Sequence, residues 1–315
     1  MIFIRMCLSL QNTVKKQPNV VSNNIFLLTV ILLTLWGSFA AVSKLALREL
    51  DSFQLQFLMF GMASILLCTI LIAKGRLKEL ITIPSKDILK LVAISVPSYL
   101  YFFLYTLSLK MLPTIEASTL NYLFPILIVL LAVPINGEKL SVFKVIALIA
   151  GFTGTLIILS NGNLSSLKMT NWGGDLLAIS GAASFAVFTN FLKRNKVDML
   201  ISNTIFAVCS FLFSGIALML FSHFTLPTLP VLGLTFWLSV SNLVLSYFVW
   251  NKLLKKCSSS LSANISFLTP FSTLLFILLL LGEKISVSQF VGLIVIVSGI
   301  ALTSFSEIRE KKLNK

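Results

Sequence analysis

Charged residues are scarce in this chain, and their scarcity excludes a large class of proteins. Asp, Glu, Lys and Arg make up 11% of the 315 residues, whereas hydrophobic residues make up 57%. A soluble domain covers its core with polar surface and carries about 25% charged residues. The mean hydropathy of +0.97 points in the same direction. We therefore expect an integral membrane protein.

The chain also has few of the groups from which enzymes build a reacting centre. It contains one histidine, His223, and four cysteines. The cysteines lack the paired spacing of a metal or redox motif, since they stand at Cys7, Cys68, Cys209 and Cys257. No Gly-x-x-x-x-Gly-Lys-Ser/Thr loop for ATP hydrolysis occurs. We expect no metal site, no cofactor and no enzyme activity.

Long apolar runs dominate what is present. A run of about 20 residues crosses the hydrocarbon core as one helix. Uninterrupted runs favour a helical bundle over a barrel, because each span then satisfies its own backbone hydrogen bonds. We predict an all-α membrane protein with ten transmembrane helices, at roughly 25–47, 53–73, 89–109, 114–134, 142–160, 175–193, 201–221, 231–253, 259–281 and 286–306.

One segment of the chain occurs twice, and the two copies keep a constant offset in residue number. Asn121-Tyr-Leu-Phe-Pro125 leads to Gly137-Glu-Lys-Leu-Ser141, and Ser266-Phe-Leu-Thr-Pro270 leads to Gly282-Glu-Lys-Ile-Ser286. Both copies lie in sequence apolar enough to cross a membrane. Two homologous membrane halves are typical of secondary transporters, whose substrate site lies between the repeats.

An odd number of spans in each repeat inverts the second repeat relative to the first. Five spans bring the chain to the opposite side of the membrane, so Glu138-Lys139 and its counterpart Glu283-Lys284 should face opposite sides. Gly37-Ser-Phe-Ala40 in the first span has a weaker echo in Ala183-Ser-Phe-Ala186 of the sixth. We therefore expect two inverted five-helix repeats.

The repeats leave only short segments outside the membrane. We expect a cytosolic tail over 1–24, the first repeat over 25–160, a polar linker over 161–174, the second repeat over 175–306 and a cytosolic tail over 307–315. The first tail carries basic residues around a short apolar patch and no small-residue cleavage site. We interpret it as a tail and not as a cleaved signal.

The basic residues are distributed unevenly along the predicted loops. Lys and Arg number 25 against 11 Asp and Glu, and most of them fall on the side that holds both termini. The positive-inside rule then places both termini in the cytoplasm, in a multi-pass protein of the cytoplasmic (inner) membrane. Membrane orientation thus explains the net charge of +14, and we expect no nucleic-acid partner. We expect a small-molecule solute and a lipid bilayer as partners, and a monomer or weak dimer.

Two prolines, Pro125 and Pro270, fall in the middle of predicted spans at equivalent positions. A proline has no amide hydrogen to donate and crowds the carbonyl four residues earlier, so both spans should kink. Symmetry places the two kinks where the halves meet, and we interpret the prolines as hinges. A kink that only improves helix packing is the alternative.

Polar and aromatic side chains gather in the spans that the symmetry places near the centre. Tyr101 and Tyr105 lie four residues apart on one helical face, as do Tyr247 and Asn251. Such a set suits a solute with an apolar or aromatic body and a few polar groups. Each tyrosine alone is equally consistent with a membrane-interface belt. The candidate binding residues are Tyr101, Tyr105, Glu116, Asn121, Tyr122, Asn190, Tyr247, Trp250 and Asn251.

Glu116 and Lys44 are ionisable residues within predicted spans. Charged groups in the hydrocarbon layer are costly and usually face a cavity or each other. Glu116 can therefore hold a cationic amino group or carry a coupling proton, and Lys44 can offset it or bind a carboxylate. Snorkelling to the outer interface is the alternative for Lys44, which lies one turn from the end of its span.

These residues resemble the drug/metabolite transporter superfamily, specifically its EamA-type ten-helix members. The resemblance covers residues 26–306 and rests on Leu35-Trp-Gly-Ser38 with Lys44 and on the proline-to-Gly-Glu-Lys segment of each half. Within the superfamily, Ile115-Glu116 before the first such segment is similar to the bacterial aromatic amino-acid exporters, and Trp250-Asn251 fits the same branch.

The resemblance implies a basket-like fold, a central cavity lined by spans one, three, four, six, eight and nine, and alternating access. It adds Trp36 to the binding residues. We expect a secondary transporter that exports an amino acid, with aromatic ones included. The alternatives are uptake or exchange of a nucleoside-derived or cationic metabolite such as S-adenosylmethionine and, from another class, a membrane-embedded scaffold or lipid-modifying enzyme.

Overall fold

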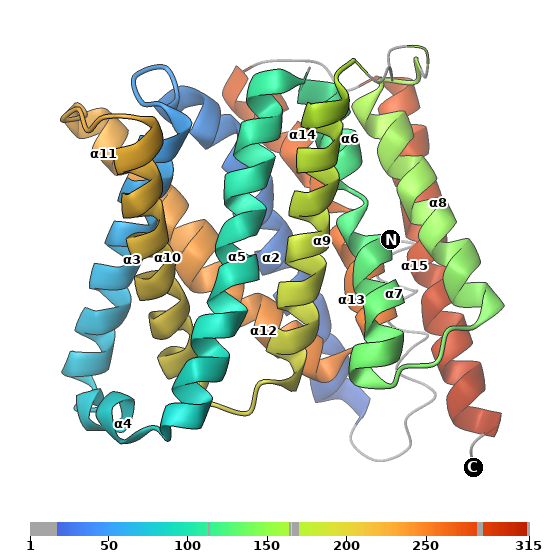
Figure 1. Cartoon of the computed structure of the whole chain (residues 1–315). Coiled ribbons are helices and arrows are strands. Elements are labelled where there is room, and N and C mark those ends of the chain that lie inside the picture. Colours follow the sequence, from blue (N-terminus) through green and yellow to red (C-terminus); the bar gives the residue numbers. More distant parts are fainter. Residues whose placement is uncertain (1–17, 113, 164, 166–169, 282–285, 314–315) are drawn as a thin grey trace.

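The computed structural model describes residues 18–112, 114–163, 165, 170–281 and 286–313, and this part of the chain forms a bundle of helices (Figure 1). The first half contains α2 (Pro18–Ala46), α3 (Ser52–Ala73), α4 (Leu77–Thr82), α5 (Ser85–Met111), α6 (Thr114–Asn121), α7 (Phe124–Asn136) and α8 (Val142–Leu159). The second half contains α9 (Trp172–Arg194), α10 (Met199–Phe221), α11 (Leu229–Leu238), η3 (Ser239–Leu245), α12 (Ser246–Lys256), α13 (Ser259–Ser266), α14 (Thr269–Leu281) and α15 (Val287–Leu313).

Each of the ten predicted spans coincides with one helix or with several helices in line. Within the described residues, eight stretches are long and apolar enough to cross a membrane, and Ile25–Phe39 of α2 is a shorter apolar one. The all-α membrane fold is therefore confirmed. The sequence did not predict the short helix α4, and α2 begins seven residues before the predicted span.

Side chains at the helix ends explain where several spans begin and stop. Asp51 caps α3 by accepting hydrogen bonds from the backbone N–H of Phe53 at 2.8 Å and of Gln54 at 2.9 Å. Burial alone would raise the pKa of Asp51, but the hydrogen bonds from Ser222, Gln54 and Phe53 together lower it by more than burial raises it. The pKa of Asp51 therefore lies below its ordinary value. Gly137 ends α7 with φ of 68°, a left-handed conformation that favours glycine.

Spans four and nine are each broken into two helices at equivalent residues. α6 ends at Asn121 and α7 begins at Phe124, and the break between α13 and α14 falls 145 residues later in each case. Pro125 and Pro270 stand in the first turn of α7 and of α14, where a missing N–H leaves no intrahelical bond unmade. The predicted kinks thus correspond to two-residue interruptions of the helix, at 122–123 and 267–268, just before each proline. Their role as hinges stays a prediction.

Span eight contains a π-helix that the sequence did not predict. η3 separates α11 from α12, and the N–H of Ser246 bonds to the carbonyl of Ser241, five residues earlier. Such wide turns are rare and occur mostly at functional sites. No proline marks this segment, which explains why the helical pattern alone predicts a regular span.

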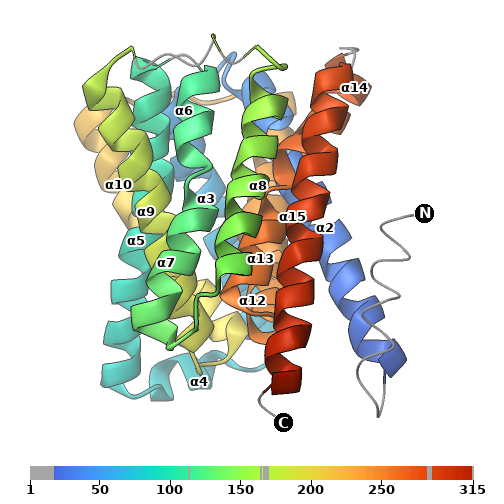
Figure 2. The same ribbon diagram turned by 90° about the vertical axis from the view of Figure 1, so that its right-hand side faces the viewer.

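The two repeats run in opposite directions through the bundle. The turn from α7 to α8 lies at the end where α2 begins and α15 finishes, whereas α14 ends and α15 begins at the opposite end (Figure 2). α8 and α15, the last helices of the two repeats, pack against each other. A Cβ added to Gly154 of α8 would lie 2.6 Å from the carbonyl oxygen of Gly292 of α15, and the reverse distance is also 2.6 Å. The inverted arrangement therefore brings equivalent helices together by a close backbone approach.

Candidate functional site

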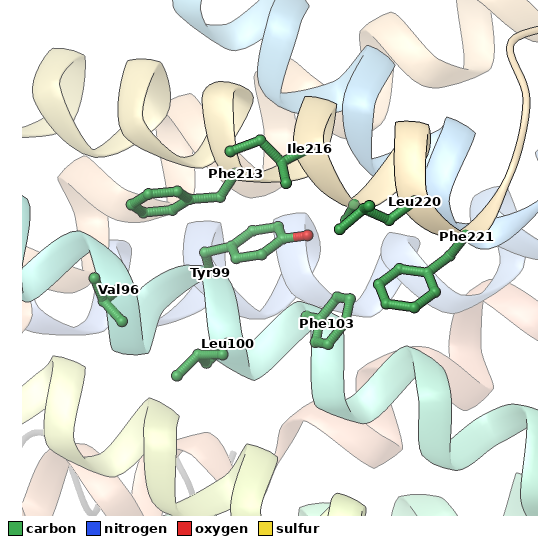
Figure 3. A pocket seen from close by; sticks show the side chains of 9 residues that line it. Val96, Tyr99, Leu100, Phe103, Phe213, Ile216, Leu220 and Phe221 are labelled. Atoms are coloured by element: carbon green, nitrogen blue, oxygen red, sulfur yellow. The ribbon is translucent and has the colours of Figure 1, made fainter.

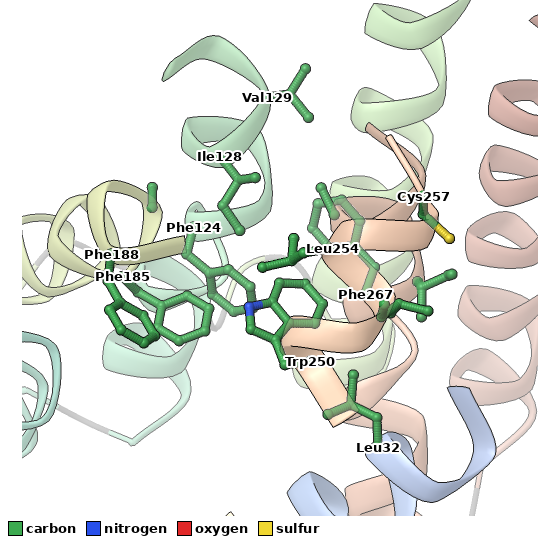
Figure 4. Packing of buried hydrophobic residues seen from close by; sticks show 14 of the residues in the cluster. Leu32, Phe124, Ile128, Val129, Phe185, Phe188, Trp250, Leu254, Cys257 and Phe267 are labelled. Atoms are coloured by element: carbon green, nitrogen blue, oxygen red, sulfur yellow. The ribbon is translucent and has the colours of Figure 1, made fainter. Parts of the chain in front are cut away.

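A cluster of aromatic rings occupies the middle of the bundle (Figure 4). Phe185 of α9 is its common member. The distances from the ring centroid of Phe185 are 4.8 Å to Tyr101, 5.0 Å to Phe124, 6.1 Å to Phe188, 6.2 Å to Trp36 and 6.4 Å to Trp250. These separations are typical of stabilising ring contacts. We call these six residues the aromatic cluster.

Both repeats contribute to the aromatic cluster. Trp36, Tyr101 and Phe124 come from α2, α5 and α7 of the first repeat, and the other three rings come from α9 and α12 of the second. The rings of Trp36 and Trp250 lie 5.1 Å apart across the boundary between repeats. Trp250 is 1% exposed, and its indole N–H donates to Thr189 at 3.3 Å. The rings themselves fill the place where the sequence predicts a central pocket.

Two buried amides near the aromatic cluster have polar atoms that lack hydrogen-bond partners. Asn121 stands at the break after α6 within hydrogen-bonding reach of the Tyr101 hydroxyl, and its amide oxygen has no donor. Asn251 is fully buried on α12, one turn after Tyr247, and neither atom of its amide has a partner. A buried amide without a partner is costly. These groups therefore favour a polar ligand or water at this position.

Three predicted tyrosines surround the aromatic cluster. Tyr105 stacks on Tyr101 with ring centroids 6.2 Å apart, and its hydroxyl lies 3.2 Å from that of Ser118. Tyr122 contacts the ring of Phe124 at 6.0 Å. Tyr247 packs on Phe188 at 5.5 Å and shares a hydrogen bond with Ser98. The tyrosines thus form a second layer around the rings.

Three other predicted residues are placed differently. Asn190 donates to the carbonyls of Ile128 and Ala186 and accepts a hydrogen bond from Asn136 at 2.6 Å. Both the NH2 group and the oxygen of its amide are therefore engaged, within α9 and with α7. Glu116 lies in the first turn of α6 and accepts hydrogen bonds from the N–H and hydroxyl of Thr170 at 2.6 and 2.7 Å. The side chain of Lys44 lies outside the described part of the structure.

Phe124, Phe185 and Phe188 belong to the aromatic cluster but were not among the candidate residues from the sequence, and Phe185 is the central one. Phenylalanine is common in the chain, with 26 residues, so its type alone gives no signal. The weak repeat of Gly37-Ser-Phe-Ala40 in Ala183-Ser-Phe-Ala186 marks the position, because it aligns Phe39 with Phe185. Phe39 contacts Phe102 of α5 at 6.4 Å, as Phe185 contacts Tyr101 of the same helix.

A second polar group joins the repeats at one end of the bundle. Glu138, in the turn after α7, pairs with Lys193 of α9 at 2.7 Å. Its two oxygens also accept hydrogen bonds from the N–H and the hydroxyl of Ser259, the first residue of α13. Lys193 donates in addition to the carbonyl of Cys257 at 3.0 Å. We call these four residues the Glu138 cluster, and it connects the Gly-Glu-Lys turn of one repeat to two helices of the other.

A groove of about 310 Å³ lies between α5 and α10 (Figure 3). Its walls are apolar, and the hydroxyl of Tyr99 is the polar group that Figure 3 shows among them. A smaller cavity of about 10 Å³ lies beside η3 and is lined by Asn203, Ser210 and Tyr247. No group of three or more His, Cys, Asp or Glu in the described residues could hold a metal ion.

Comparison with known proteins relates the whole chain to membrane transporters. The model of the EamA-like transporter family matches twice, over residues 24–160 and 172–305. An uncharacterized transporter of Bacillus subtilis, YvbV, is 28% identical over 90% of this chain and 93% of its own length. An uncharacterized transporter of Archaeoglobus fulgidus is 29% identical over 88% of this chain and 96% of its own.

Two further proteins are similar to this chain over nearly its full length. The uncharacterized inner membrane transporter YicL of Salmonella typhimurium is 26% identical over 90% of this chain and 96% of its own length. A solved crystal structure superposes with a TM-score of 0.79 over 91% of this chain and 98% of that one, at 21% identity, which shows a shared fold. The two family matches coincide with the two inverted repeats, and the chain belongs to the EamA-like transporter family, as a multi-pass membrane transporter.

Proposed function

We propose that this protein exports a small amphipathic metabolite, with an aromatic amino acid as the leading candidate. One observation carries the proposal: rings from both repeats meet near the buried amides of Asn121, whose oxygen has no donor, and of Asn251, which has no partner at either atom. An aromatic amino acid offers a ring for the aromatic cluster and polar groups for the amides. Trp36, Tyr101 and Trp250 would stack on its ring, with Tyr105, Tyr122 and Tyr247 around them.

The proposed mechanism is alternating access between the two repeats. The aromatic cluster lies at the boundary of the repeats, and the Glu138 cluster closes that boundary at one end. Opening that end requires α9 and α13 to move away from the turn after α7. The breaks before Pro125 and Pro270 allow part of a helix to move while the rest stays packed, and we propose the two prolines as hinges.

We propose the cytoplasmic membrane as the location, with both termini in the cytoplasm. The name of the Salmonella relative supports an inner membrane, and the bias of basic residues supports the orientation. On this orientation the Glu138 cluster faces the cytoplasm, so this conformation is closed on that side. We further propose residues 25–160 and 175–306 as the two repeats and a monomer or weak dimer as the functional state.

Counterflow in proteoliposomes tests the substrate. We expect exchange of labelled tryptophan, phenylalanine or tyrosine, and a loss of about tenfold in the rate for Phe185→Leu, since several ring contacts of up to about 1.5 kcal/mol each are weakened. Phe103→Leu is the matched control, because this residue lines the groove between α5 and α10 and lies apart from the aromatic cluster. Thermal stability of both variants separates a binding defect from misfolding.

The outcomes distinguish the alternatives. Exchange of S-adenosylmethionine without exchange of any amino acid would replace export of amino acids by transport of a cationic metabolite. The hydrogen bonds from Thr170 already occupy both oxygens of Glu116, which is the counter-charge that this alternative needs. An absence of exchange with every solute, together with a stable protein, would favour a scaffold or a lipid-modifying enzyme.

A further inference from the structure

Two carboxyl groups meet at the end of the bundle opposite the Glu138 cluster. Glu116 belongs to the first turn of α6, and Asp175 belongs to the first turn of α9, which packs beside it (Figure 1). Ala117, next to Glu116, and Ala178, one turn after Asp175, belong to the same small buried cluster, so the two acidic side chains lie beside each other where α6 meets α9. Glu116 is 6% exposed and Asp175 is 1% exposed. Both acids are therefore removed from water at one place.

The carboxyl groups of Glu116 and Asp175 differ in the hydrogen bonds that they receive. Glu116 accepts two hydrogen bonds from Thr170, at 2.6 and 2.7 Å. Neither carboxyl oxygen of Asp175 receives a hydrogen bond from any donor. A buried carboxylate without a donor or a counter-ion is strongly unfavourable, whereas a protonated carboxyl needs only one acceptor. Asp175 has that acceptor in Glu116.

The charges on neighbouring helices do not neutralise the pair. Lys110 of α5 directs its ammonium group over the ring of Phe53, 4.3 Å from the centroid. The other basic groups on helices packed against α6 and α9 stand at the end of the Glu138 cluster, namely Lys86, Lys90, Lys144, Lys193, Arg194, Lys252, Lys255 and Lys256. Tyr105 shares its hydroxyl with Ser118. Among the described residues, the pair therefore lacks a cation.

The N-terminus of α9 affects the charge that the Glu116–Asp175 pair can carry. A helix N-terminus stabilises one nearby negative charge, by less than about 1 kcal/mol at an exposed site and up to about 2 kcal/mol at a partly buried one. It favours one carboxylate but cannot offset two in contact, because two like charges at hydrogen-bonding distance repel strongly in a buried site. One shared proton turns this repulsion into an O–H···O hydrogen bond.

We propose that Glu116 and Asp175 together bind one exchangeable proton, which makes them the proton site of this transporter. The proton leaves a water molecule or hydronium ion and forms an O–H bond on one carboxyl, and no other bond changes. Thr170 and Asn171, directly before α9, and Trp172, its first residue, are exposed, so the site lies within one turn of the aqueous surface. The coupling of this proton to solute flux rests on the proposed transport function.

Infrared spectroscopy of the purified protein tests the shared proton directly. At neutral pH the wild type should show the C=O band of a protonated carboxyl, which ordinary carboxylates do not show. Asp175→Asn should lose this band, since the carboxyl of Glu116 then keeps its two hydrogen bonds from Thr170 and no second carboxyl lies beside it to share a proton. Asp51→Asn is the control and should keep it, because the lowered pKa of Asp51 leaves that group ionised in the wild type.

The result that overturns the proposal is either a wild type without the band or an Asp175→Asn variant that keeps it. The first outcome would also result from an ion pair with Lys168, a linker residue outside the described part of the chain. A shared proton and an ion pair therefore give opposite spectra in the wild type.

A second measurement, of thermal stability as a function of pH, tests the same proton in the wild type and separates its loss from misfolding of a variant. The wild type should become thermally more stable as the pH falls from about 8 to about 6, because the folded state binds a proton that the unfolded state has released. Asp175→Asn mimics the protonated acid, so it should be stable at neutral pH and lose this rise, and a retained rise would contradict the shared proton. Neither measurement uses a transported solute, so a failure of the proposed substrate leaves both results unaffected.

Discussion

Glu138 connects the two repeats through both of its carboxylate oxygens, and its partners predict what its loss would do. Glu138→Gln removes the ion pair with Lys193, whose side chain is only 19% exposed, and weakens the contact with Ser259. A hydrogen bond to a charged group contributes about 1.5–3 kcal/mol, so opening of this end should become about tenfold more frequent. We expect Cys257, which is 8% exposed, to react about tenfold faster with a water-soluble maleimide.

The measurement needs a background in which Cys7, Cys68 and Cys209 are replaced by serine. Glu49→Gln is the matched control, because Glu49 also accepts two hydrogen bonds, from Thr228, at the opposite end of the bundle. It should leave the reactivity of Cys257 unchanged. Equal rates for Glu138→Gln and the wild type would show that the Glu138 cluster does not hold this end closed.

Candidate residues of rare types lie together in the structure, and their role in binding stays a prediction. Trp36, Tyr101 and Trp250 belong to types with few copies in the chain, and the structure brings all three together around Phe185. Phe185 itself could not be distinguished from other phenylalanines in apolar helices. Asn190 is the contrasting case. A buried amide can hold helices together or bind a ligand, and the hydrogen bonds of Asn190 in the structure join helices.

Helix contacts provide the next prediction, on the pair formed by α8 and α15. A Cβ at Gly154 would lie 2.6 Å from both the Gly292 carbonyl oxygen and a side-chain carbon of Ile296, so Gly154→Ala forces the two helices apart. Overpacking of this kind costs about 1–3 kcal/mol. We expect a lower midpoint in thermal unfolding of the purified protein.

Gly233 of α11 is the matched control for this change. An added Cβ at Gly233 meets nothing within 4 Å, so Gly233→Ala should raise the midpoint slightly, because alanine favours a helix by about 0.5–1 kcal/mol over glycine. The two substitutions are chemically identical and have opposite expected signs. A Gly154→Ala variant as stable as Gly233→Ala would contradict a tight contact between α8 and α15.

Elements were predicted from the sequence where a residue forces the backbone. Pro125 and Pro270 removed a backbone donor, and the structure breaks the helix before each of them. The π-helix η3 has no such residue, because its Ser, Val, Asn and Leu side chains fit a regular helix equally well. The π-helix packs against α2 and α3, and such tertiary contacts are not recorded in a local sequence pattern.

At the scale of the whole molecule, the inverted repeat followed from counting spans and aligning two short segments. Helices α6, α7 and α8 begin 145 residues before α13, α14 and α15 in turn, so the duplication extends to the helix boundaries themselves. The composition of the spans could not show that the rings close the centre of the bundle. That property arises from side chains on five helices that are far apart in the sequence.

The inverted arrangement predicts opposite sidedness for two equivalent valines. Val142 and Val287 are the first residues of α8 and α15, and they are 72% and 83% exposed. In a protein without other cysteines, a membrane-impermeant maleimide added to intact cells should label Val287→Cys at once and Val142→Cys only after the membrane is disrupted. Labelling of both from the same side would contradict inverted repeats. Labelling of Val142→Cys alone would keep the inversion and reverse the proposed orientation, which would place the Glu138 cluster outside and the Glu116–Asp175 pair in the cytoplasm.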